Sequence, residues 1–198
     1  MRGLATYRFW AYAAAFGALW GAVENTVGMF IHAIKLPFGS IVLAGFGAAL
    51  LVALRVLMPA RGTVLAAGMV CAGVKMLCPG GAVIGPMVGI IVESLLVELV
   101  LLPTGSNGLS SGLAGGLACL WSITQRLITQ TLLFGTPVIG IYKGIAEQAE
   151  RLLHLPASGG ASVVAVFLGI VAAIGVTFGL TGLRVGKRAS RILTMREP

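Results

Sequence analysis

The sequence predicts an all-α membrane protein, a compact bundle of six transmembrane helices that forms a single domain over residues 1–198. The first observation is composition: 58% of the residues are hydrophobic and only 10% are charged, whereas soluble domains have roughly 45–50% apolar and about 25% charged residues. The second is length, because 198 residues hold about six crossings of roughly 20 residues each. A separate soluble domain is excluded.

Six apolar runs, separated by Pro- and Gly-rich turns, mark the expected helices. They cover residues 9–31, 38–58, 63–77, 82–102, 109–134 and 161–183. The first resembles a cleaved signal peptide as far as Ala22, but it continues to Ile31 and reaches spanning length, which favours a helix. The third is short, so we expect it to be tilted or broken near Pro79. Residues 139–155 mix apolar and charged side chains, which predicts an external interfacial helix or ordered loop between helices five and six.

The distribution of basic residues predicts the orientation. Lys75 and Arg126 fall inside expected spans, and the other Lys and Arg residues divide unequally between the two sides. One side receives Arg2, Arg8, Arg55, Arg61, Arg184, Lys187, Arg188, Arg191 and Arg196. The other receives Lys35, Lys143 and Arg151. This excess predicts that both termini are cytoplasmic, in the cytoplasmic membrane of a prokaryote. It assigns the net charge of +8 to orientation and contact with membrane lipids rather than to nucleic acid.

The first expected helix carries a ridge of small residues. Ala14, Ala18 and Ala22 are four residues apart, with Gly17 and Gly21 beside them. Small residues let a second helix approach closely in a membrane, where the hydrophobic effect does not drive helices together. The pattern alone favours internal packing of this ridge over docking of a partner protein.

Eight side chains near the outer half or the midplane form the candidate substrate site. They are Glu24, Asn25, His32, Lys75, Cys78, Glu93, Arg126 and Gln130. Charged groups in a bilayer cost roughly 2.5–3.5 kcal/mol each, so they should face the bundle interior and one another. We expect Glu93 and Arg126 to form an ion pair, and the set to line an outward cavity for a polar or charged small molecule. The alternative is that Glu93–Arg126 and Glu24–Lys75 only lock the fold.

The sequence predicts neither an enzyme nor a bound cofactor. It has no HExxH, GxSxG or Walker A motif and no aspartate, so the common hydrolytic and phosphoryl-transfer machineries are missing. His32 and Cys78 are soft donors that could ligate a metal centre carried by a substrate. Their spacing is not that of a metal site of the protein itself, and Cys71, Cys78 and Cys119 indicate no disulfide framework.

The six-helix length, the cytoplasmic termini, the alanine ridge and the Gly/Pro-rich segment of residues 77–87 together resemble a known family. They are similar to the substrate-binding S components of energy-coupling factor (ECF) vitamin transporters. The resemblance implies that Ala14, Ala18 and Ala22 dock onto the transmembrane coupling subunit of an ATPase module. It also implies an outward vitamin site closed by loops at residues 33–37 and 137–158. Some members bind cobalamin, one group with a cysteine near the cobalt, but no second motif carries that role over to Cys78.

We therefore expect a membrane subunit that binds a small water-soluble nutrient, a vitamin or cofactor precursor, for uptake driven by partner ATPase and coupling subunits. One alternative is a small structural or assembly subunit of a larger membrane complex, with the polar residues holding helices together. A third reading is an ion-coupled transporter that uses Glu24 or Glu93, although the two halves of the chain show no convincing repeat.

Overall fold

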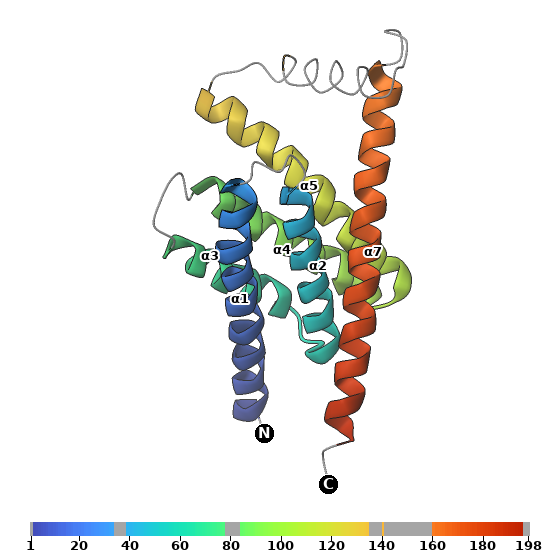
Figure 1. Cartoon of the computed structure of the whole chain (residues 1–198). Coiled ribbons are helices and arrows are strands. Elements are labelled where there is room, and N and C mark those ends of the chain that lie inside the picture. Colours follow the sequence, from blue (N-terminus) through green and yellow to red (C-terminus); the bar gives the residue numbers. More distant parts are fainter. Residues whose placement is uncertain (1, 34–38, 78–83, 135–139, 141–159, 196–198) are drawn as a thin grey trace.

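The computed structural model describes the whole chain except residues 1, 34–38, 78–83, 135–139, 141–159 and 196–198 (Figure 1). The described residues form helices and no strands. The helices are α1 (Arg2–Ala33), α2 (Gly39–Leu57), α3 (Thr63–Met76), α4 (Ile84–Thr104), α5 (Gly108–Phe134) and α7 (Gly160–Thr194). The all-helical fold class and the positions of the six expected helices are confirmed. The interfacial segment expected at residues 139–155 lies outside the described residues, apart from Gly140.

Within the described parts of the chain, four helices are long and apolar enough to cross a membrane. These stretches are Thr6–Ile31, Gly39–Leu57, Ile84–Thr104 and Val164–Thr194. Helix α3 is apolar but has only 14 residues, in agreement with the expectation that the third helix is short. The structure is thus compatible with a multi-pass membrane protein, while the full set of six crossings and the side on which the termini lie stay predictions.

Helix α7 is longer than the sequence predicted. It ends at Thr194 rather than at residue 183, because the basic segment that follows the apolar run continues the helix. Glycines at positions 182 and 186 do not interrupt it, since both lie against the backbone or side chains of α2. The last turns of α7 extend with the start of α1 toward the end of the bundle that carries both termini (Figure 1).

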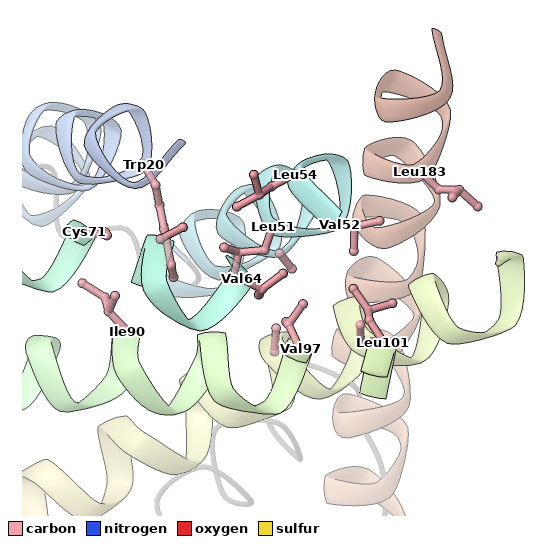
Figure 2. Close-up of a cluster of buried hydrophobic side chains, with 14 of the residues drawn as sticks. Trp20, Leu51, Val52, Leu54, Val64, Cys71, Ile90, Val97, Leu101 and Leu183 are labelled. Carbon is pink, nitrogen blue, oxygen red and sulfur yellow. The ribbon is translucent and has the colours of Figure 1, made fainter. Parts of the chain in front are cut away.

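Helix α2 is the central element, because it contacts every other described helix. The main hydrophobic cluster forms around it from buried side chains of α1, α2, α3, α4, α5 and α7, many of which are labelled in Figure 2. Trp20 of α1 packs against Gly47 of α2, where a Cβ atom would stand 2.6 Å from the indole. Leu51 and Leu54 of α2 are fully buried in the same cluster.

Glycines set the closest helix crossings. Helices α5 and α7 cross where a Cβ on Gly115 would overlap the carbonyl oxygen of Gly175 and stand 2.9 Å from the amide nitrogen of Gly179. Such backbone-to-backbone contact maximises van der Waals packing between helices in lipid. Neither backbone can yield to an added methyl group without moving the whole helix.

The α5–α7 crossing gives a direct test of this packing. Gly115→Ala is expected to lower the free energy of unfolding by about 1–3 kcal/mol through overpacking, visible as a lower apparent melting temperature in detergent. The matched control is Gly116→Ala on the same helix, where the nearest atom to a new Cβ is 3.5 Å away. The control is expected to be neutral or stabilising, because alanine favours helix over glycine. Equal melting temperatures for the two variants would contradict the assigned crossing.

Candidate functional site

A buried carboxylate organises the polar residues at the inner end, by which we mean the end that carries the termini. Glu98 of α4 is 4% exposed and accepts a hydrogen bond from the guanidinium of Arg55 on α2, at 3.1 Å. Its Oε1 also accepts the amide of Gly62, at 2.8 Å, and its Oε2 accepts the amides of Val64 and Leu65, at 3.0 and 3.4 Å. Glu98 therefore caps the N-terminus of α3 from another helix. The positive end of the helix dipole lies there and also stabilises the negative charge of the carboxylate.

The Glu98 cap was not expected from the sequence, which placed Arg55 among the loop cations. Arg55 is only 5% exposed and also donates to the carbonyl oxygen of Ala60. The turn into α3 depends on Gly62, whose φ of 83° lies in the left-handed region that favours glycine. The sequence offered one signal for this contact: Arg55 and Glu98 lie at a similar depth, each near the end of an expected helix, the second and the fourth.

At the outer end, α1 and α3 are joined by polar side chains that the sequence did single out. The Lys75 ammonium lies 3.6 Å from the Glu24 carboxylate and donates to the Glu24 carbonyl oxygen at 3.1 Å. Asn25 donates from Nδ2 to the carbonyl oxygen of Val74 at 3.3 Å. Three of the eight predicted site residues thus meet at one place, which we call the outer polar cluster.

Glu93 of α4 approaches this cluster from the interior. Its side chain is 6% exposed, and it lies within electrostatic range of the Glu24 carboxylate. The Cys71 thiol of α3 is within range of Glu24, Lys75 and Glu93. Oxygen Oε1 of Glu93 and Oδ1 of Asn25 are both buried without a hydrogen-bond partner among the described residues. Nε1 of Trp20 and Oγ of Ser111 are also buried without a partner among the described residues. A buried polar atom left unsatisfied costs about 1–3 kcal/mol.

The predicted Glu93–Arg126 ion pair was wrong. The ion pairs among the described residues are Arg55–Glu98 and Glu24–Lys75, and Arg126 is exposed. The face of α5 toward α4 instead carries Trp121 and Gln125, which donate to the carbonyl oxygens of Gly89 and Gly85 at 3.2 and 2.8 Å. Arg126 is the next residue along and is rotated by about 100° from that face.

Three of the predicted site residues lie wholly or partly outside the described residues. Cys78 lies outside the described residues, as do the side chains of His32, near the outer end of α1, and Gln130, near the end of α5. Two other thiols are buried, and Cys119 of α5 donates from Sγ to the carbonyl oxygen of Ile41 at 3.6 Å. Within the described part of the chain, no three His, Cys, Asp or Glu residues gather as metal ligands would.

Two neighbouring ridges of small residues on α1 have different environments. Gly17 and Gly21 are buried, and a Cβ on either would collide with α3. Ala14, Ala18 and Ala22 are all exposed on the outside of the bundle. The interpretation of the alanine ridge as internal packing is therefore wrong for the described residues, since the glycines make that contact.

Comparisons with known proteins add no family. No protein-family model matches the chain, and no curated protein or solved structure matches it significantly.

The Glu98 cap gives a stability prediction. Glu98→Gln is expected to cost about 3–5 kcal/mol, because it leaves the buried Arg55 guanidinium without its counter-charge. Glu24→Gln is the matched control and should cost less, since Lys75 keeps its hydrogen bond to the Glu24 backbone. The measurement is the apparent melting temperature of each purified variant in the same detergent. Equal losses would mean that Glu98 does not have the structural role assigned to it.

Proposed function

We propose that the protein is a membrane-embedded substrate-binding subunit that captures a small water-soluble nutrient, a vitamin or cofactor precursor. In this proposal six helices cross the cytoplasmic membrane of a prokaryote with both termini inside. The carrying observation is the pair of buried acceptors at Glu93 and Asn25, beside the Glu24–Lys75 pair. Ionisable groups inside a membrane bundle are functional by default, and a ligand with hydrogen-bond donors would satisfy these atoms.

The alanine ridge supports a partner that energises uptake. Ala14, Ala18 and Ala22 form an exposed strip of small side chains on a helix whose other exposed residues include Trp10 and Leu19. Such a strip offers little contact to lipid chains but admits another helix closely. We propose that it docks the transmembrane coupling subunit of an ECF-type ATPase module, because the chain itself has no nucleotide-binding motif.

A second function is favoured by the other polar contacts. The Arg55–Glu98 and Glu24–Lys75 pairs both join different helices, as polar residues do when they hold a bundle together. A structural or assembly subunit of a larger membrane complex would need these pairs and no ligand. A measurement of ligand binding that depends on Glu93 distinguishes the substrate-binding subunit from the assembly subunit.

The binding test uses the full chain in detergent and a screen of vitamins and their precursors by thermal shift and calorimetry. We expect at least one compound to bind, with affinity about tenfold or more weaker in Glu93→Gln, the scale of one lost charged hydrogen bond. The unliganded variant should keep its melting temperature, because Oε1 of Glu93 has no partner to lose among the described residues.

The control for this test is Ser122→Ala, which removes a buried polar group whose hydrogen bond stays within α5. It should bind the same compound with unchanged affinity. Absence of any bound compound, or equal affinity in Glu93→Gln and the unmodified chain, would favour the assembly subunit.

The docking test co-expresses the chain with the coupling subunit and ATPases of an ECF module. Ala14→Leu with Ala18→Leu should abolish co-purification and leave ligand binding intact, because both positions are exposed. The control pair, Ala165→Leu with Ala173→Leu, adds the same bulk at exposed positions of α7 and should co-purify normally. Normal co-purification of the α1 variant would exclude this ridge as the docking surface.

A further inference from the structure

The last three turns of α7 carry a continuous basic face. Arg184, Lys187, Arg188 and Arg191 are all exposed. Their spacing of three, four and seven residues puts them on one side of the helix, within an arc of about 100°. The sequence has no acidic residue from position 151 to position 196, so the helix itself supplies no charge that would neutralise this face.

The basic face points away from the protein. Gly182 and Gly186 lie on the opposite side of α7 and contact α2. A Cβ on Gly182 would overlap the carbonyl oxygen of Ala49, and one on Gly186 would stand 2.9 Å from Cβ of Val56. Residues two positions from either glycine are rotated by about 160° from it. The cations therefore face whatever surrounds the bundle.

The level of the basic face follows from the same contacts. Gly186 meets Ala53 and Val56 in the last two turns of α2, which ends at Leu57 just before the turn into α3. Turn backbone at the periphery of a membrane protein lies outside the hydrocarbon layer, because its polar groups need water. The apolar stretch from Val164 to Leu183 rises by about 30 Å, the thickness of that layer. The cations begin directly after it.

We propose that Arg184, Lys187, Arg188 and Arg191 form a binding face for the headgroups of anionic phospholipids in the leaflet at the end that carries both termini. Guanidinium groups pair with phosphate in a bidentate manner, and basic side chains next to a membrane segment attract anionic lipid. This inference rests on the membrane placement proposed above, but it is independent of the substrate and of the alanine ridge.

The test reconstitutes the full chain in phosphatidylcholine vesicles that contain a trace of spin-labelled phosphatidylglycerol or spin-labelled phosphatidylcholine. Electron paramagnetic resonance measures the fraction of each labelled lipid that the protein restricts in motion. At low ionic strength we expect the protein to restrict about three times as much labelled phosphatidylglycerol as labelled phosphatidylcholine. This ratio should fall toward one in the double variant Lys187→Gln with Arg191→Gln, and also in high salt.

The matched control, Arg8→Gln with Arg61→Gln, removes two exposed cations and changes the net charge equally. It should keep most of the preference. An unchanged preference in the α7 variant would overturn the lipid-binding face and leave an acidic protein segment as the partner of these cations. An equal loss of preference in the control would also overturn it, because the net charge of the protein would then be the cause. A spectrum without restricted lipid of either kind would instead overturn the membrane placement, and the proposed function with it.

Discussion

The carboxylate of Glu98 is the contact on which the arrangement of the inner bundle depends. Helix α3 begins directly after a left-handed turn at Gly62, and the free amides of its first turn are largely buried. Helix termini leave such groups unsatisfied, and burial inside the protein leaves no room for water to take the place of a partner. Glu98 accepts three of them and pairs with Arg55. One side chain thus links α2, α3 and α4, and it sets the position from which α3 carries Cys71 and Lys75 toward the outer polar cluster.

The two glutamates of α4 are both buried, but they differ in whether their carboxylate oxygens have hydrogen-bond donors. Glu98 has donors on both oxygens, so its burial is compensated and its role is structural. Glu93 is one and a half turns away, equally buried, with Oε1 lacking a partner among the described residues. A buried acceptor without a donor is retained at a cost in stability. The contrast between the two residues is the physical basis for giving Glu98 a structural role and for proposing that Glu93 takes part in ligand binding.

The abundant glycines determine which face of each helix packs against the rest of the bundle. On α1, Gly17 and Gly21 lie so close to α3 that no side chain fits, which turns the adjacent alanines outward. On α7, Gly182 and Gly186 fit against α2 in the same way and turn the cations of the last turns outward. In a membrane, where apolar burial does not orient helices, such close backbone contacts determine rotation about the helix axis. Both surfaces proposed for partners are therefore consequences of internal glycine packing.

The sequence by itself determined where the helices lie, because apolar run length and Pro/Gly turns are local properties. It also placed Glu24, Asn25 and Lys75 at one level, and the structure brings these three together. Only the tertiary structure decided which way each helix turns. Depth suggested Arg126 as the partner of Glu93, but the face of α5 toward α4 belongs to Trp121 and Gln125. Rotation about a helix axis depends on contacts with residues distant in the chain, and a residue's position along its own helix contains no information about them.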